Sequence, residues 1–269
     1  MAECGICPHN CNIPEGLAGL CGIRENRNGK IVSAAYGVVS SLAIDPIEKK
    51  PLYRFHLGRP ILSIGGFGCN LRCPFCQNHQ IALSYEGISG RSFSPEDIAA
   101  AAKQIPGNIG VAYTYNEPLI NYEFLRDCAD LVHNAGMFNV LVTNGFVNRE
   151  PLEALLPFID AMNIDLKGFT EEFYRSVGGR LQPVLDTIAL AHKHCHVEVT
   201  TLIIPGENEE HIEPLAEWLA GLSAEIPLHI SRFFPCHKYM DKQPTPKETI
   251  YRLCDIAKKH LTFVYPGNV

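Results

Sequence analysis

Three cysteines lie close together in a glycine-rich stretch of the first half of the chain. Cys69, Cys73 and Cys76 have the spacing C-x3-C-x2-C within residues 65–78. Thiolates at such short spacing are ligands for soft metals. A [4Fe–4S] cluster has four irons, so three cysteines leave one iron open to another ligand. The alternative is a zinc site with His79 as the fourth ligand, because structural zinc takes four protein ligands.

The elements that must position this loop follow a regular order. The apolar residues 61–64 lead directly into the loop and predict a strand. We expect further strands near 110–114, 138–142, 161–166, 196–203, 228–233 and 261–265. Helical patterns lie between them, near 98–104, 119–134, 149–156, 170–177, 181–194, 208–222 and 245–259. This alternation indicates about six β–α units joined by right-handed crossovers into a parallel sheet, and both an open sheet and a barrel are compatible with it.

Polar side chains follow each predicted strand, at the edge where parallel α/β folds bind ligands. Buried charges are costly unless they pair or bind something, so core packing alone does not explain this set. Beyond the cysteine loop its members are Asn116, Glu117, Thr143, Asn144, Asp165, Lys167, Glu198, Thr200, Thr201, His229, Ser231 and Arg232. Structural ion pairs are the alternative for Asp165 with Lys167, for Glu198 with a lysine or arginine, and for Arg232.

A second cysteine group opens the chain and comprises Cys4, Cys7, Cys11 and Cys21. Four thiolates at this spacing can hold zinc or an auxiliary iron–sulfur cluster. Free thiols in a loosely packed lobe are the alternative, and we expect His9 to be a neighbour rather than a ligand.

Residues 30–44 contain β-branched runs and predict one or two strands of a small N-terminal sheet. Residues 45–55 have mixed charges and two prolines, which predict an irregular connector. This connector is either a solvated crossing segment or part of the site wall. We therefore divide the chain into an N-terminal lobe with connector, residues 1–58, and an α/β domain, residues 59–269.

The composition and charge of the chain argue against nucleic acids and membranes as partners. The chain has 269 residues and a net charge of −6. It has no lysine- or arginine-rich run of the kind that nucleic-acid binding requires, and no apolar run long enough to span a membrane. It shows no secretory signal and its cysteines fall into short-spaced groups, so we expect a cytoplasmic protein in a reducing compartment. We expect His192, His194 and His196 to be surface residues, and Cys128, Cys195, Cys236 and Cys254 to be ordinary thiols.

The motif Cys69-x3-Cys73-x-Phe75-Cys76 resembles the cluster loop of the radical S-adenosylmethionine (radical SAM) enzymes. Asn116-Glu117-Pro118 resembles the Gly-Gly-Glu-Pro stretch of that family, with Tyr115 and Asn116 in place of the glycines. Residues 143–146 and 165–167 resemble stretches of the pyruvate formate-lyase activating enzymes. Together with residues 7–11 and 45–53, these motifs resemble the activating-enzyme-like subfamily that is also named after the AmmeMemoRadiSam gene group. The resemblance covers residues 4–268, and many of these relatives continue into a further cysteine-bearing tail.

This resemblance implies an α/β fold, namely an incomplete TIM-like (β/α)6 barrel with a small cysteine-rich N-terminal lobe. It implies a [4Fe–4S] cluster on Cys69, Cys73 and Cys76, with the amino and carboxylate groups of SAM on the open iron. Glu117 is then expected to meet the SAM amino group and Phe75 to lie near the adenine. The further SAM-site residues that it implies are Asn116, Thr143, Asn144, Asp165, Lys167 and Arg232.

The activity that the resemblance implies is the reductive cleavage of SAM to a 5′-deoxyadenosyl radical, which abstracts hydrogen from a substrate. It implies an electron donor of the flavodoxin or ferredoxin type and a protein substrate in which a glycyl radical is formed. Radical modification of a small molecule or peptide is the alternative within the enzyme class. A non-catalytic iron–sulfur redox or sensor protein is the alternative outside it, and the polar strand ends argue against that class because electron transfer alone needs no such rim.

Overall fold

The computed structural model describes residues 1–83 and 90–269. Its centre is an eight-stranded sheet in the order β14-β13-β12-β11-β10-β9-β7-β6. All of its strands except β6 run parallel, as predicted. They are β7 (Pro60–Gly65), β9 (Gly110–Tyr113), β10 (Phe138–Thr143), β11 (Ala161–Asp165), β12 (His196–Ile203), β13 (Leu228–Arg232) and β14 (Val264–Gly267). The last strand begins three residues later than the sequence predicts, at Val264 rather than residue 261.

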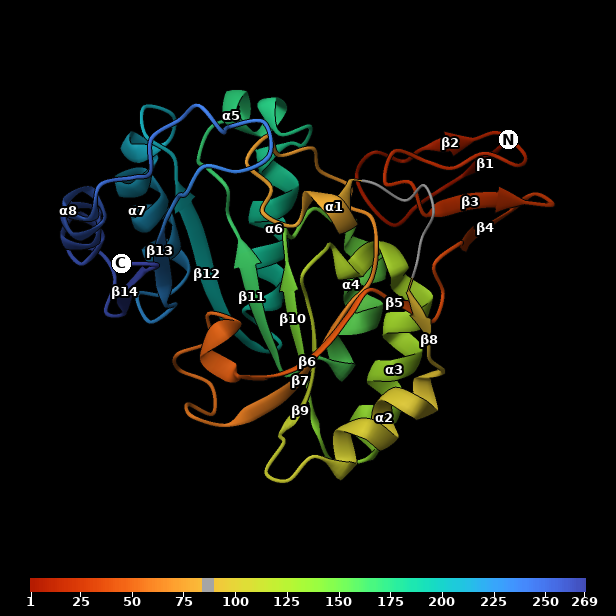
Figure 1. Ribbon diagram of the computed structural model, residues 1–269. Coiled ribbons are helices and arrows are strands. Elements are labelled where there is room, and N and C mark those ends of the chain that lie inside the picture. Colours follow the sequence, from red (N-terminus) through yellow and green to blue (C-terminus); the bar gives the residue numbers. More distant parts are fainter. Residues whose placement is uncertain (84–89) are drawn as a thin grey trace.

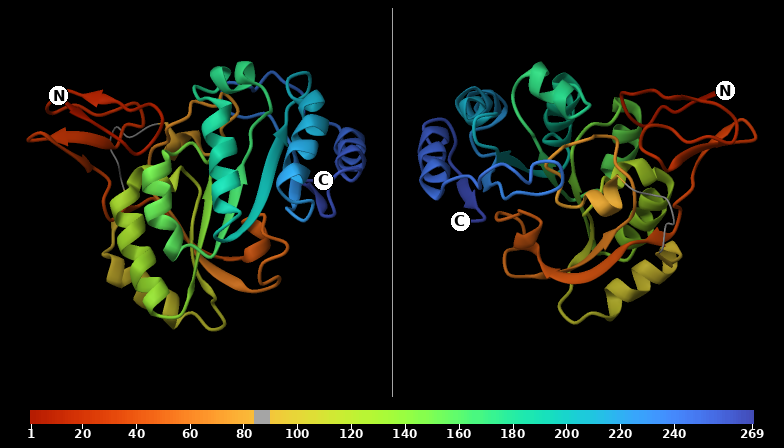
Figure 2. Two further views of the ribbon diagram at one scale, coloured as in Figure 1. Left: turned by 180° about the vertical axis from the view of Figure 1, so that it is seen from behind. Right: turned by 45° about the horizontal axis from the view of Figure 1, so that its top comes forward.

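The helices connect these strands and cover one face of the sheet (Figures 1 and 2). They are α2 (Pro95–Gln104), α3 (Tyr122–Asn134), α4 (Arg149–Leu155), α5 (Glu171–Ser176), α6 (Leu181–Ala191), α7 (Ile212–Leu222) and α8 (Lys247–Ala257). Short 3-10 turns precede two of them, η2 (Pro118–Asn121) before α3 and η4 (Glu209–His211) before α7. The Ser94 side chain accepts from Asp97 N–H and Asp97 accepts from Ser94 N–H, which is the capping box that fixes the start of α2.

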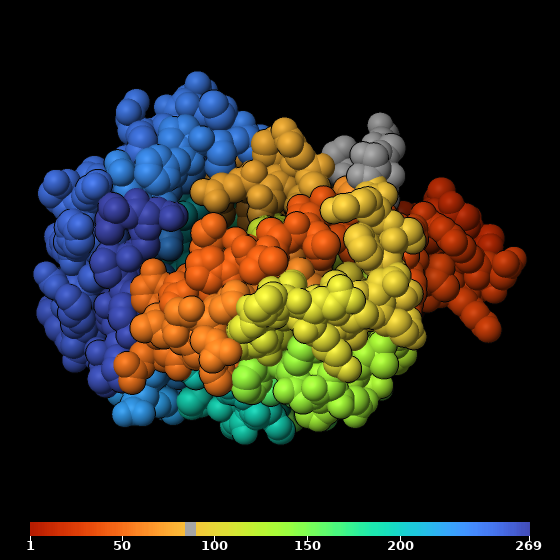
Figure 3. Space-filling model, turned by 60° about the horizontal axis from the view of Figure 1, so that its bottom comes forward, coloured from red at the N-terminus to blue at the C-terminus, as the bar shows by residue number. Residues whose placement is uncertain are grey.

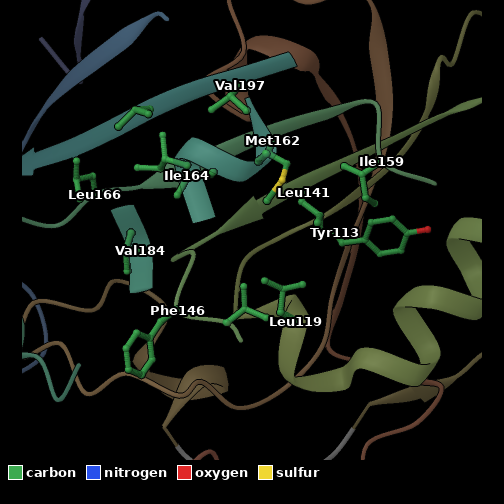
Figure 4. Packing of buried hydrophobic residues seen from close by; sticks show 14 of the residues in the cluster. Tyr113, Leu119, Leu141, Phe146, Ile159, Met162, Ile164, Leu166, Val184 and Val197 are labelled. Atoms are coloured by element: carbon green, nitrogen blue, oxygen red, sulfur yellow. The ribbon is translucent and has the colours of Figure 1, made fainter. Parts of the chain in front are cut away.

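The apolar core lies between the sheet and its helices. Figure 4 shows Leu141, Met162, Ile164 and Val197 of adjacent strands packed together, with Val184 of α6 against them. Each of these side chains is buried. Strands covered on both faces read as nearly continuous apolar runs, which is why the sequence predicts them well. The alternating strands and helices therefore form the six β–α units of an incomplete barrel, as expected.

Strand β6 (Ser41–Pro46) departs from the prediction. The sequence predicts a separate N-terminal sheet for residues 30–44, but β6 joins the main sheet antiparallel to β7, from Ser41 opposite Gly65 to Pro46 opposite Pro60. Within residues 30–44, β4 (Lys30–Ser33) forms a hairpin with β3 (Arg24–Arg27), and residues 38–39 pair with residues 91–92. Local β-propensity cannot say which strand a segment pairs with, because the partner is chosen by tertiary packing.

The connector after β6 packs into the concave face of the sheet. It contains η1 (Ile47–Lys49), and Ile47 and Leu52 are buried against Ile61 and Val140. Figure 3 shows this segment, in orange, at the centre of its face between the blue C-terminal residues and the yellow residues. Ile47 and Leu52 thus anchor the connector in the core, while Lys49, Arg54 and Leu57 stay exposed. The division at residue 58 stays a prediction, although it separates two paired strands.

The N-terminal lobe projects to one side of the sheet (Figure 1). It contains the antiparallel pair β1 (Ala2–Glu3) and β2 (Asn12–Ile13) and the β3–β4 hairpin. The pair β5 (Val38–Val39) and β8 (Arg91–Ser92) lies between the lobe and α2. Within the described ranges, no helix is both long and apolar enough to cross a membrane.

Candidate functional site

A cavity of about 350 Å³ opens at the carboxyl ends of the parallel strands. Its volume lies within the usual range for small-molecule sites. Figure 1 shows β10 and β11 pointing towards the loop that carries α1 (His79–Ala82) at this end. All the predicted cluster and SAM-site residues except Arg232 line this cavity, namely Cys69, Cys73, Phe75, Cys76, Asn116, Glu117, Thr143, Asn144, Asp165 and Lys167.

The cysteine loop is positioned by backbone contacts on both sides. Arg72 N–H donates to Val177 O at 2.7 Å, and Leu71 N–H points at the Cys69 sulfur at 3.4 Å. Burial raises the pKa of all three thiols, that of Cys73 to about 11. Without a metal these thiols are therefore neutral at pH 7, and binding a metal must displace their protons.

The three sulfurs do not converge on one point. In residues 1–83 and 90–269, no three Cys, His, Asp or Glu side chains lie close enough to share a single metal ion. A four-iron cube ligates each cysteine through a different iron, so its thiolates need not converge. The donor set and the open cavity beside it fit such a cluster with a further ligand. A closed zinc site requires a fourth protein donor, and His79, the expected one, does not line this cavity.

Glu117 is a fully engaged carboxylate in the wall of this cavity. It is 2% exposed and follows β9. Its Oε1 accepts from Thr143 Oγ1 at 2.7 Å and Leu119 N–H at 3.1 Å, and its Oε2 accepts from Asn144 N–H at 2.8 Å. Burial raises the pKa of Glu117 to about 7, although these hydrogen bonds act to lower it. A ligand cation that reaches this carboxylate favours its ionised form.

The backbone before Glu117 adopts a conformation that glycine usually provides, although Tyr115 and Asn116 occupy these positions. Tyr115 has φ of 73°, in the left-handed region that costs a side-chain-bearing residue about 1–2 kcal/mol. Tyr115 donates to Asp45 Oδ2 at 2.8 Å, and Lys50 lies 4.7 Å from its ring centroid. These contacts offset the strain. Gly65 provides the space, since a Cβ there would lie 2.8 Å from the Tyr115 ring.

The Asn116 side chain clamps the cysteine loop from the neighbouring strand end. Its Oδ1 accepts from Gly66 N–H at 2.9 Å. Its Nδ2 donates to Phe67 O at 2.9 Å and Gly68 O at 3.1 Å. Asn116 is thus a cavity residue, as predicted, but its polar atoms already bind the loop.

Asn144 contacts the cysteine loop from β10. Its Nδ2 donates to Asn70 Oδ1 at 2.9 Å and lies 3.6 Å from the Cys69 sulfur. Its Oδ1 accepts from Phe146 N–H at 2.8 Å, which fixes the amide orientation. An N–H aimed at a cysteine sulfur is a group that stabilises a metal-bound thiolate and tunes its cluster.

Asp165 and Lys167 form an ion pair at 2.8 Å, with both side chains partly exposed on the cavity wall. Burial alone would lower the pKa of Lys167, but Asp165 and the thiols of Cys73 and Cys76 raise it above its ordinary value. The pairing predicted as the alternative is therefore present, and it lies on the cavity. Asp165 and Lys167 can therefore pair with each other and still face a ligand in the cavity.

Arg232 is the predicted residue that the structure places elsewhere. Its guanidinium Nε donates to Thr245 O, and its guanidinium carbon lies 4.7 Å from the centroid of the Phe234 ring. Ser231 of β13 and Asn268, which follows β14, line the cavity instead. Side chains alternate across a strand, so neighbouring positions such as 231 and 232 face opposite ways.

Phe75 is 4% exposed and packs with Phe173 and Tyr239, at ring-centroid distances of 6.3 and 6.0 Å. The thiol of Cys236 donates to Phe75 O at 3.1 Å. Cys236, expected to be an ordinary thiol, thus supports the loop from the segment after β13.

Glu198 pairs with histidines rather than with the predicted lysine or arginine. It is 0% exposed and accepts from His229 Nε2 at 2.6 Å and His196 Nε2 at 3.0 Å. The N–H groups of Tyr53 and Arg54 donate to it at 3.1 and 2.7 Å. His196 is therefore a Glu198 partner and not simply a surface residue, whereas His194 is exposed as expected.

The connector forms part of the cavity wall, which is one of the two alternatives that the sequence leaves open for it. Lys49, Lys50 and Pro51 line it, and Asn163 Nδ2 donates to Pro51 O at 2.7 Å. The charged residues between two prolines predict an irregular connector, but they do not tell which of its residues reach the cavity. Its course across the sheet depends on contacts more than a hundred residues away in the chain, and local sequence does not encode these.

Comparisons with known proteins agree with this geometry. The sequence profile described as the radical SAM superfamily matches residues 63–219, more than half of the chain. An uncharacterized protein of Methanocaldococcus jannaschii is 45% identical over 276 residues, which cover 99% of this chain and 81% of that protein.

The named relatives are more distant. The pyruvate formate-lyase 1-activating enzyme of Escherichia coli is 27% identical over 152 residues, which cover 53% of this chain and 61% of that enzyme. Among solved structures, a domain of the pyruvate-formate lyase-activating enzyme from Bacteroides vulgatus has a TM-score of 0.51 and 22% identity. The match covers 59% of this chain and 99% of that domain, and it shows a likeness of fold.

Proposed function

We propose that this chain, which belongs to the radical SAM superfamily, binds a [4Fe–4S] cluster through Cys69, Cys73 and Cys76 and cleaves SAM reductively. When bound, this pair of cofactors supplies a 5′-deoxyadenosyl radical for hydrogen abstraction. The observation that carries the proposal is a single cavity that brings the three-cysteine loop together with the polar ends of β9, β10 and β11. Sequence positions far apart are thereby assembled into one site.

The chain's own residues have separable tasks in this proposal. Cys69, Cys73 and Cys76 hold three irons, and Asn144 N–H donation towards Cys69 stabilises the bound thiolate. Glu117 accepts the ammonium group of SAM, because a buried carboxylate in the cavity wall is the complementary partner for a cation. The Asp165–Lys167 pair presents one acid and one cation to the cavity, suited to hydroxyl and carboxylate groups of the ligand.

Binding of SAM beside the cluster is testable by spectroscopy. The cluster is reconstituted anaerobically and reduced with dithionite, and its EPR spectrum is recorded with and without SAM. We expect the spectrum to change on SAM addition, since a new ligand on the open iron alters the cluster. An unchanged spectrum at saturating SAM would contradict the proposed site.

For the substrate, we propose a glycine residue of a partner protein, which becomes a glycyl radical. The support is the name of the E. coli relative, a pyruvate formate-lyase 1-activating enzyme. An electron donor of the flavodoxin or ferredoxin type supplies the electron in this proposal. Incubation of the reduced enzyme and SAM with proteins that co-purify anaerobically should yield a glycyl-radical EPR signal. SAM cleavage without such a signal would favour a small molecule or a peptide as the substrate.

A further inference from the structure

The four N-terminal cysteines surround one enclosed space. The β1–β2 pair brings the first three together, with Cys4 N–H donating to Cys11 O at 2.9 Å. The turn before β3 adds Cys21, and Ile120 of η2 closes the space from the α/β domain. The side chains of Cys4, Cys7, Cys11, Cys21, His9 and Arg24 line the same small cavity.

A buried arginine in this wall lacks one hydrogen-bond acceptor. Arg24 is 4% exposed, and its Nη2 donates to Glu123 Oε1 at 2.9 Å. Its Nε–H is buried and has no partner among the described residues. A buried donor without an acceptor costs about 1–3 kcal/mol. Neutral thiols are weak acceptors, whereas metal-bound thiolates are anionic, so a loaded site would supply what Arg24 lacks.

We propose that Cys4, Cys7, Cys11 and Cys21 bind one Zn²⁺ ion as a closed structural site. The space they enclose is small, about 10 Å³, and four thiolates are the complete donor set of a closed tetrahedral zinc site. His9 is not needed as a ligand, because the four thiolates alone complete a tetrahedral site. In the described residues no three such side chains already share one point, so zinc binding here requires the thiols to lose their protons and their side chains to turn towards the ion.

The proposed zinc site lies where the N-terminal lobe contacts the cysteine loop. The lobe is bound to the cysteine loop by the His9–Asn70 contact and by Arg72, which donates to Leu20 O. A Cβ at Gly68 would lie 2.7 Å from Cys21 O, so the two backbones are in direct contact. Zinc at the four cysteines therefore fixes the lobe against the loop that holds Cys69, and its role is structural.

Metal counting tests the proposal independently of SAM chemistry. Zinc and iron are measured by mass spectrometry in the anaerobically purified full chain. We expect about one zinc per chain, its loss in Cys21→Ser, and its retention in the matched control Cys128→Ser, whose thiol is buried in the core. A variant with Cys69, Cys73 and Cys76 replaced by alanine should lose iron and keep zinc. Loss of iron rather than zinc in Cys21→Ser would overturn the proposal in favour of a second cluster, and wild-type protein without zinc would overturn it outright.

Cobalt substitution keeps all four N-terminal cysteines and so avoids a variant that fails to fold. Co²⁺ is added to the full chain carrying the three alanine replacements, in which no SAM cluster obscures the visible spectrum. We expect intense sulfur-to-cobalt charge transfer with the ligand-field bands of a tetrahedral thiolate site, and their disappearance on adding Zn²⁺. A weak spectrum without sulfur bands would contradict a four-cysteine site.

Discussion

Glu117 is the residue whose environment has the most direct consequence for ligand binding. It accepts three hydrogen bonds within the protein, and burial nevertheless raises its pKa to about 7. Near neutral pH the carboxyl group is therefore divided between its neutral and ionised forms. Only the ionised form attracts an ammonium group, so pH controls the fraction of sites ready to bind SAM.

We predict that SAM affinity falls as pH decreases through 7, because protonation removes the Glu117 charge. Glu117→Gln should bind SAM about 10–100-fold more weakly at pH 8, the equivalent of one charge-assisted hydrogen bond. Anaerobic calorimetry from pH 6 to 8 measures both effects. Glu153→Gln on the exposed face of α4 is the control, since Glu153 does not line the cavity, and it should bind SAM as the wild type does. The same pH dependence in Glu117→Gln would rule out Glu117 as its source.

At the scale of the element, the cysteine loop is held by the ends of neighbouring strands. Asn116 bonds three consecutive loop residues, and Asn144 reaches Asn70 and the Cys69 sulfur. The loop is therefore preorganised for three thiolate ligands before any metal binds. Preorganisation lowers the ordering cost of binding.

Asn116→Ala should weaken cluster retention, because the loop loses its contacts at Gly66, Phe67 and Gly68 together. We expect at least a several-fold faster loss of iron during anaerobic gel filtration with a chelator, in line with the 10–100-fold effects of outer-shell changes on metal affinity. Asn134→Ala is the control, since Asn134 bonds only the exposed Asp130 of its own helix. Equal iron loss in both variants would show that the Asn116 hydrogen bonds do not contribute to cluster retention.

The connector between β6 and β7 is held across the sheet by Glu198. Burial alone would raise the pKa of Glu198, but hydrogen bonds from His196, His229 and Arg54 N–H lower it to about 2. A carboxyl whose folded pKa lies below its unfolded value stabilises the fold above the unfolded pKa. That stabilisation is lost as pH falls from about 4.5 towards 2.

Glu198→Gln should lower the free energy of unfolding at pH 7 by on the order of 3 kcal/mol. This is the free energy that corresponds to the lowered pKa of Glu198. At pH 3 the difference between variant and wild type should shrink, because the wild-type carboxyl loses much of its advantage. Urea unfolding at the two pH values measures this. Glu153→Gln on the exposed face of α4 is the control and should change stability by less than about 1 kcal/mol. A difference that is the same at both pH values would contradict the assigned role.

For the molecule as a whole, the sequence predicts what is encoded locally. Apolar runs bounded by Gly, Pro and capping residues such as Ser94 predict the strands and helices within a few residues. Parallel order then brings Glu117, Thr143 and Asp165 to one edge, so most of the cavity could be predicted without coordinates.

What the sequence could not predict depends on contacts between distant segments. The antiparallel placement of β6 and the path of the connector follow from packing against the concave face of the sheet. Tyr115 keeps a glycine-like φ because Asp45 and Lys50 support its ring from another part of the chain. Arg232 was predicted to be at the site because of its position at a strand end, but its guanidinium contacts Thr245.

SAM cleavage in the cavity around Cys69, Cys73 and Cys76 is the proposed activity. The most direct measurement is the amount of 5′-deoxyadenosine formed by the reconstituted enzyme with dithionite and SAM under strict anaerobic conditions. We predict its formation by the wild type and by Cys254→Ser, whose buried thiol lies in the core, and its abolition in Cys73→Ala. Absence of 5′-deoxyadenosine from wild-type protein that carries a full complement of cluster iron would contradict SAM cleavage at this site.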